Sequence, residues 1–160
     1  MPGLEDLYRE IVLDHYRSPR NRGELPVPPS HRAEGFNPLC GDEIVVFVQV
    51  DGDTITDVKI GGQGCSISQS SASMMSAAIK GKTIHEARAL TRAFKLMMSI
   101  HETALEGGDV ETTSADPAVK LGDLEALRGV ARVPVRIKCA TLSWNTLAQT
   151  LDDAEQEIEA

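Results

Sequence analysis

Three cysteines and one aspartate are the residues of this sequence best suited to chemistry. Cys40 and Asp42 stand in NPLCGDEIVVFVQV, directly before a β-branched run, and Cys65 and Cys139 each precede an expected helix. Three thiolates and one carboxylate would supply four ligands for tetrahedral zinc, and thiolates also bind ferrous iron or an iron–sulfur cluster. These four residues are therefore a candidate metal site.

The spacing of the cysteines does not establish such a site by itself. They lie far apart, form no Cys-x-x-Cys pair and are odd in number, so neither a compact zinc motif nor a disulfide framework is indicated. Buried, unreactive thiols are the ordinary alternative. Glycines precede Cys65, but the full G-x-x-x-x-G-K-S pattern of a phosphate-binding loop is absent.

The residues around the cysteines favour reactive thiolates. A helix N-terminus stabilises a thiolate through its partial positive charge, and we expect Cys65 and Cys139 at two such ends. Arg136 and Lys138 flank Cys139 and would add to this effect.

Composition restricts the class of protein. The 160 residues carry a net charge of −8, which argues against general nucleic-acid binding. No apolar run approaches the roughly 20 residues that span a bilayer, and MPGLEDLYRE lacks the apolar stretch of a signal peptide. With no heptads and no long apolar strip, we expect a soluble, cytoplasmic monomer without a membrane partner.

The first half of the chain predicts a helix and a small sheet. Apolar spacing indicates a helix over residues 4–16, with His15 packed on its apolar face. Residues 44–50 and 54–60 are β-branched runs joined by Asp51-Gly52-Asp53, which predicts a hairpin. HRAEGFN, before Cys40, is expected to add an edge strand.

The second half predicts helices. A helix of small residues follows Cys65, and Thr83-Ile84-His85-Glu86 forms a capping box that opens a helix through about Glu106. A polar loop over 106–120 and a short helical segment should follow. We expect VARVPVRIK to be extended and the final helix to begin at Cys139.

Taken together, these motifs resemble one known family. NPxCGD before a hairpin, GxGCxIS opening a small-residue helix, and a third cysteine opening the last helix are similar to the IscU/SufU (NifU N-terminal-like) iron–sulfur assembly proteins. LYREIVLDHYRSPRNRGEL also resembles the first helix and following loop of that family. The likeness covers nearly the whole chain in order, so we expect one domain over 1–160.

Three departures favour the SufU branch of the family. Lys138 stands where IscU scaffolds have a histidine, and VARVPVRIK replaces their Leu-Pro-Pro-Val segment. Residues 106–130 resemble the insertion that distinguishes SufU proteins.

The resemblance implies an α+β fold (SufE/NifU-like) with a three-stranded antiparallel sheet packed against several helices. It also implies a zinc ion held by Cys40, Asp42, Cys65 and Cys139. Proteins of the SufU type take persulfide sulfur from a SufS-type cysteine desulfurase and pass it to downstream Suf assembly proteins. Their activity is at most that of a zinc-dependent sulfurtransferase. Cys40, on a glycine-flanked turn, is the candidate persulfide acceptor, and Cys139 is the second candidate.

Two alternatives remain open at this stage. The same four residues could bind iron and scaffold a [2Fe–2S] cluster, although Lys138 in place of histidine weakens that reading. A purely structural zinc module is the other, and an aspartate ligand argues against it because structural zinc sites are built from cysteine and histidine.

Overall fold

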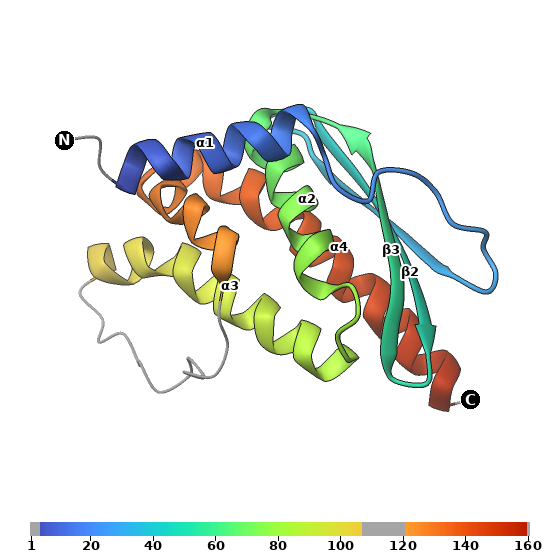
Figure 1. Cartoon of the computed structure of the whole chain (residues 1–160). Helices are drawn as coiled ribbons and strands as arrows, with labels where there is room; N and C mark the ends of the chain where they lie inside the picture. Colours follow the sequence, from blue (N-terminus) through green and yellow to red (C-terminus); the bar gives the residue numbers. More distant parts are fainter. Residues whose placement is uncertain (1–3, 107–120, 160) are drawn as a thin grey trace.

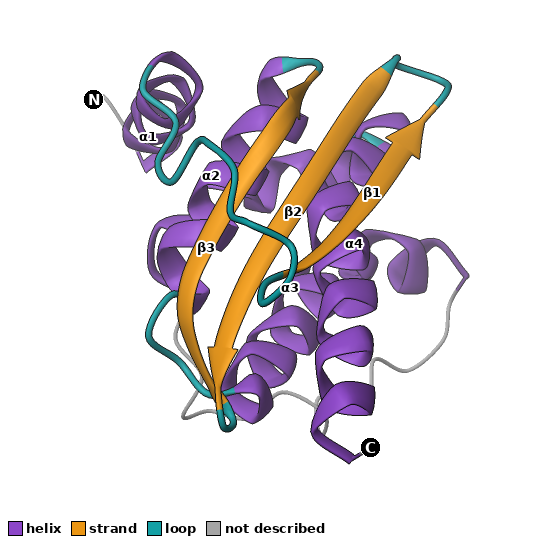
Figure 2. Cartoon of the chain, turned by 90° about the vertical axis from the view of Figure 1, so that its right-hand side faces the viewer, coloured by secondary structure: helices purple, strands orange, loops and turns teal. Residues whose placement is uncertain are grey.

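The expected α+β architecture is confirmed. A computed structural model describes residues 4–106 and 121–159, with side chains described for 6–99 and 121–156. Helices cover one face of a three-stranded sheet (Figures 1 and 2). The elements in chain order are α1 (Leu4–Arg17), β1 (His31–Asn37), β2 (Asp42–Asp51), β3 (Thr54–Gln63), α2 (Ser66–Ile79), α3 (Ile84–Glu106), η2 (Gly122–Arg132) and α4 (Pro134–Glu159).

The sheet is an antiparallel meander in the order β1-β2-β3. The predicted hairpin is present, because Asp51 pairs with Thr54 and Gly52 takes a φ of +65° in the turn. HRAEGFN forms the expected edge strand β1. The connection from α1 to β1 passes over the face of β3 and β2 that is turned away from the helices (Figure 2).

The core lies between the sheet and the helices. Alternate residues of β2 and β3 point inward and are fully buried, among them Val46, Val48 and Val58. The predicted helix over 84–106 is present, and Phe94 from it stacks on Trp144 of α4 with ring centroids 4.8 Å apart. The capping box also forms, since Thr83 and Glu86 exchange hydrogen bonds.

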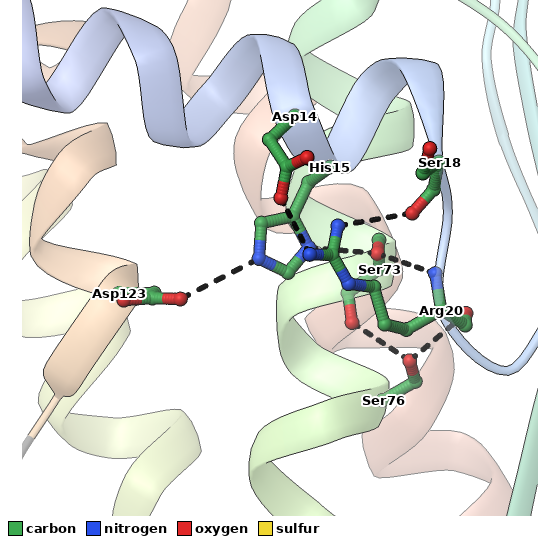
Figure 3. A network of polar contacts seen from close by, with 7 residues as sticks. All are labelled: Asp14, His15, Ser18, Arg20, Ser73, Ser76 and Asp123. Atoms are coloured by element: carbon green, nitrogen blue, oxygen red, sulfur yellow. Dashed lines mark hydrogen bonds and ion pairs between the residues drawn. The ribbon is translucent and has the colours of Figure 1, made fainter.

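A polar network joins α1 to the helices beneath it (Figure 3). His15 is buried, and its Nδ1 lies 2.8 Å from the Ser73 hydroxyl of α2. Ser73 also accepts the backbone N–H of Arg20 at 2.8 Å, and the other ring nitrogen of His15 lies 3.6 Å from Asp123 of η2. The expectation that His15 is a packed residue is therefore confirmed.

One predicted element is wrong. VARVPVRIK is not extended, because η2 continues to Arg132 and α4 begins at Pro134. Proline is favoured at the first position of a helix, where its missing N–H has no intrahelical partner to lose. Cys139 consequently lies inside α4 rather than at its start.

The short helical segment expected after the polar loop is present as the 3₁₀ helix η2. Most of the expected loop, 107–120, falls outside the described residues. Within the described ranges, no helix combines the length and the apolar character needed to cross a bilayer.

Candidate metal centre

Asp42 is the first residue of β2, and the alternation of that strand turns its side chain inward. Ile44, Val46 and Val48 occupy the same face of β2 and form part of the core. Asp42 is in phase with them and is completely buried. Burying a carboxylate costs free energy unless it accepts hydrogen bonds, so Asp42 needs hydrogen-bond donors or a cation around it.

Three hydrogen-bond donors surround the Asp42 carboxylate. Oδ1 accepts the backbone N–H of Cys65 at 2.9 Å and the Ser68 hydroxyl at 3.2 Å. Oδ2 accepts a longer bond of 3.3 Å from the Asn37 amide. Oδ1 is thus held by α2 and the residue before it, while Oδ2 keeps capacity for a metal ion.

Cys40 reaches this place from the tight turn between β1 and β2. Asn37 pairs with Asp42 across the turn, and Gly41 takes a φ of +68°, a conformation that favours glycine. The Cys40 side chain is half-buried, with the exposed Leu39 beside it in the chain. Cys40 is therefore both anchored near Asp42 and open to solvent.

Cys139 comes from α4 and lies beneath Cys40. Its thiol donates to the sulfur of Cys40 at 3.3 Å, and its sulfur accepts the Asn37 amide at 3.6 Å. Cys139 is fully buried. The nearest potential ligand atoms of Cys40, Asp42 and Cys139 all lie within 4.8 Å of one another.

Cys65 lies next to Cys40, Asp42 and Cys139 but is not one of the residues whose ligand atoms cluster within 4.8 Å. It is the N-cap of α2, as expected, and its sulfur accepts the backbone N–H of Ser68 at 3.4 Å. Its own backbone N–H is bound to Asp42. Of the four predicted ligands, the structure therefore collects Cys40, Asp42 and Cys139 and places Cys65 alongside them.

The junction between β3 and α2 needs a glycine next to Asp42. A Cβ atom at Gly64 would lie 2.5 Å from Asp42 Oδ1 and 2.6 Å from the Ser68 hydroxyl. Both distances are too short for a real side chain. The β1–β2 turn and this junction lie at the same end of the sheet (Figure 2), so the absence of a side chain at Gly64 lets the carboxylate approach α2.

The Cys139 thiol and the Asp42 carboxyl are shifted in opposite directions in the metal-free protein. Burial, followed by hydrogen bonds to Cys40 and Asp42, raises the pKa of the Cys139 thiol. Burial alone would raise the pKa of Asp42, but hydrogen bonds from Cys65, Cys139, Ser68 and Asn37 outweigh it and lower that pKa. The expectation of a helix-start thiolate at Cys139 is wrong, because α4 begins earlier and the thiol is buried.

Arg136 adds a positive charge at the site. The thiolate forms of Cys65, Cys139 and Cys40 raise the pKa of its guanidinium. The sequence indicated Arg136 as a neighbour of Cys139 alone, whereas the first turn of α4 directs it toward all three cysteines. A cation in this position favours thiolates electrostatically.

Sequence reasoning did not identify Asn37, Ser68 or Gly64 as parts of the site. Asn37 belongs to NPLCGD, and Gly64 and Ser68 belong to GQGCSIS, so the motifs contained the signal. Their contacts with Asp42 depend on the pairing of distant segments, which the motifs alone do not specify.

The donor set fits a zinc ion. Zinc in proteins takes thiolate, imidazole and carboxylate ligands in a tetrahedral arrangement. Two thiols and one carboxylate are gathered here, a third thiol is adjacent, and the buried Cys139 thiol has a proton that a metal would replace.

This chain is similar to known proteins along most of its length. The family model described as the NifU-like N terminal domain matches residues 7–140. A zinc-dependent sulfurtransferase, SufU of Bacillus subtilis, is 46% identical over 144 residues, which cover 90% of this chain and 88% of that protein. An iron–sulfur cluster assembly scaffold protein, IscU of Streptococcus pyogenes, is 40% identical over 149 residues, covering 92% and 84%.

Solved structures share the fold. A scaffold protein for the SUF system from Fervidobacterium islandicum superposes with a TM-score of 0.73 at 32% identity, over 93% of this chain and 99% of that one. The N-terminal part of a NifU-like protein from Brucella abortus gives a TM-score of 0.77 over 96% and 97% of the two chains. Its 22% identity supports the fold alone.

Proposed function

This chain belongs to the family of the NifU-like N-terminal domain, and on that basis we propose that it is an iron–sulfur cluster assembly protein that accepts sulfur in a zinc-dependent manner. The sulfur donor is a SufS-type cysteine desulfurase, and the recipients are downstream Suf assembly proteins. The chain works in the cytoplasm as a monomer and forms one domain over 1–160, in which 106–130 is the SufU-type insertion.

One observation carries this proposal: Cys40, Asp42 and Cys139 come from the β1–β2 turn, β2 and α4 and place their ligand atoms within 4.8 Å. With Cys65 beside them, they are the residues we assign to zinc. When bound, zinc would supply the charge that keeps the thiols deprotonated and ordered.

Cys40 is the residue that we assign as sulfur acceptor. It is half-buried, whereas Cys139 is fully buried beneath it. The Cys40 thiolate attacks the outer sulfur of the cysteine persulfide of the donor. The sulfur–sulfur bond of the donor breaks, a new one forms on Cys40, and the donor cysteine leaves as a thiolate, so no external oxidant is needed.

The remaining residues of the site prepare Cys40 for this step. Gly41, with its positive φ and no atom within 4 Å of a Cβ placed there, leaves the turn room to move. Arg136 favours the thiolate and offsets negative charge as the persulfide approaches. Asp42 anchors the turn to α2 through Cys65 and Ser68.

A cluster scaffold is the second candidate function, because relatives such as that of Streptococcus pyogenes are scaffold proteins and share the chain almost end to end. In that case iron and sulfide are cargo on the same residues. Anaerobic reconstitution, followed by visible and Mössbauer spectra, separates the two functions. A stable cluster that transfers to an acceptor protein favours the scaffold.

A structural zinc module is the third candidate. Cys40 is partly exposed, and Leu39, which precedes it in the chain, is exposed as well, whereas structural zinc sites are closed. If Cys40→Ser unfolded the protein yet left sulfur transfer intact, the structural reading would replace ours.

The experiment that tests the proposed function combines metal analysis with a desulfurase assay. We expect one zinc per chain in the purified protein and faster cysteine turnover by the desulfurase when the protein is added. A metal-free protein that stimulates the desulfurase fully would contradict zinc dependence.

A further inference from the structure

A groove outside the metal centre runs between α1, the start of α2 and the end of η2. Its volume is about 750 Å³, within the range of pockets that bind a ligand or an anchoring side chain. Apolar side chains form much of its wall, among them Tyr8 and Val12 of α1, Ile67 of α2 and Val130 of η2. Figure 1 shows η2 alongside the first half of α1.

The groove is lined by positive charges, whereas the chain as a whole is negatively charged. The whole protein carries a net charge of −8. The lining of the groove nevertheless includes Arg9, Arg128 and Arg132, and none of the described residues that line it is an aspartate or glutamate. Such a local reversal favours a negatively charged partner.

Two of these arginines are available for a partner. Arg128 already bonds to Glu125 at 3.1 Å. Arg9 and Arg132 are exposed, and within the described part of the chain neither has a carboxylate partner. A guanidinium binds a carboxylate through two parallel hydrogen bonds, which gives both strength and direction.

The groove is joined to the metal centre through α2. Ser66 and Ile67 line it and directly follow Cys65, whose backbone N–H is held by Asp42. A protein bound in the groove therefore contacts the same helix that borders the site. A partner that contacts both the groove and the metal centre is held in one orientation relative to Cys40.

We propose that this groove, called here the arginine groove (Arg9, Arg128 and Arg132 over the apolar wall), binds an acidic segment of the sulfur-donating protein through one or two apolar anchor side chains flanked by carboxylates. The inference rests on the proposed function for the identity of the partner. Its chemistry rests on the three arginines, the apolar wall and the absence of acidic residues from the described lining.

The groove is not built for a small phosphate. Phosphate sites at helix starts use free backbone N–H groups, but at the start of α2 the N–H of Cys65 is bound to Asp42 and that of Ser68 to the Cys65 sulfur. Charged contacts come instead from arginines around an apolar wall, the arrangement that suits an amphipathic chain.

The test measures the dissociation constant between the zinc-loaded protein and a cysteine desulfurase of the SufS type. The double variant Arg9→Glu/Arg132→Glu is compared with Arg92→Glu, which reverses an exposed arginine of α3 outside the groove. We expect the double variant to weaken binding about tenfold or more, with its zinc content and its Cys40 alkylation rate unchanged. The Arg92→Glu control should bind within about twofold of the wild type, since exposed charges outside an interface contribute little.

Equal dissociation constants for the double variant and Arg92→Glu would overturn the proposal. So would a stronger effect of millimolar inorganic phosphate on the complex than of sodium chloride at equal ionic strength, since that result identifies a small-anion site. A wild-type protein that does not bind the desulfurase at all contradicts the proposed function instead, which keeps the two failures distinct.

Discussion

The carboxylate of Asp42 accepts the backbone N–H of Cys65 at 2.9 Å, and this bond ties the first residue of β2 to the cap of α2. It joins two motifs that lie far apart in the sequence. Both residues are proposed zinc ligands, so this hydrogen bond holds the backbone of Cys65 next to the carboxylate of Asp42 before any metal binds.

Removing the Asp42 carboxylate should therefore cost folding stability as well as metal affinity. In Asp42→Ala the donors of Cys65, Ser68 and Asn37 lose their acceptor inside the protein. We expect the metal-free variant to lose about 1–3 kcal/mol of unfolding free energy, measured by urea denaturation. Asp42→Asn keeps an oxygen for Cys65 and should lose less. Equal stability of both variants and the wild type would contradict this role.

A side chain at Gly64 should disrupt the same contact. In Gly64→Ala the new Cβ would lie 2.5 Å from Asp42 Oδ1, so the carboxylate or α2 must shift. We expect a lower zinc affinity by chelator competition and an earlier urea midpoint. The matched control is Gly61→Ala in β3, where the nearest atom to a Cβ lies 3.9 Å away. That control should stay within about 0.5 kcal/mol of the wild type, and equal losses in both variants would refute the close-approach argument.

Loss of Arg136 should make the thiols less reactive. Its guanidinium interacts with Cys65, Cys139 and Cys40, and an opposite charge beside a thiol stabilises the thiolate form through which alkylation proceeds. We expect Arg136→Ala to slow iodoacetamide alkylation of Cys40 in the metal-free protein by about twofold to tenfold, as expected for the loss of one neighbouring positive charge. Lys138→Ala, two residues further on, is the control and should react near the wild-type rate. A faster rate in Arg136→Ala would reverse the assigned electrostatic role.

The buried His15 should make stability fall in mild acid. Burial, helped by the charge of Arg20, lowers the pKa of His15 below its usual 6.5, against the opposing effect of Asp123. Below about pH 6.5 the unfolded chain therefore binds a proton that the folded protein resists, and the unfolding free energy falls as pH drops toward the folded pKa. The slope from this one group is at most about 1.4 kcal/mol per pH unit.

Urea denaturation between about pH 7.5 and about pH 5.5 checks this prediction. His15→Gln should show a flatter dependence than the wild type. If His15→Gln kept the wild-type slope, the titrating group would not be His15.

Local signals in the sequence predicted most of the fold. The Asp-Gly turn, the β-branched runs and the capping box each act over a few residues, so the hairpin and α3 follow from them directly. The start of α4 did not follow. VARVPVRIK was expected to be extended, whereas the helix runs from Pro134 through the buried Cys139.

The site was predictable in its residue types and less so in its arrangement. The cysteines and Asp42 were identifiable from their motifs, whereas the close group of Cys40, Asp42 and Cys139 depends on how α4 packs against β1 and β2. Asn37 and Ser68 were missed for the same reason. Their hydrogen bonds to Asp42 form only when β1 pairs with β2 and α2 packs beside them, which the motifs do not specify.

The central claim is that Cys40 receives the sulfur while the other proposed ligands stay in place. Peptide mass spectrometry, after a single turnover with a cysteine desulfurase and cysteine, tests it most directly. The account predicts a mass increase of one sulfur atom on the peptide that contains Cys40, and no such increase on those that contain Cys65 or Cys139. Persulfide on the Cys139 peptide, with Cys40 unmodified, would contradict the assignment.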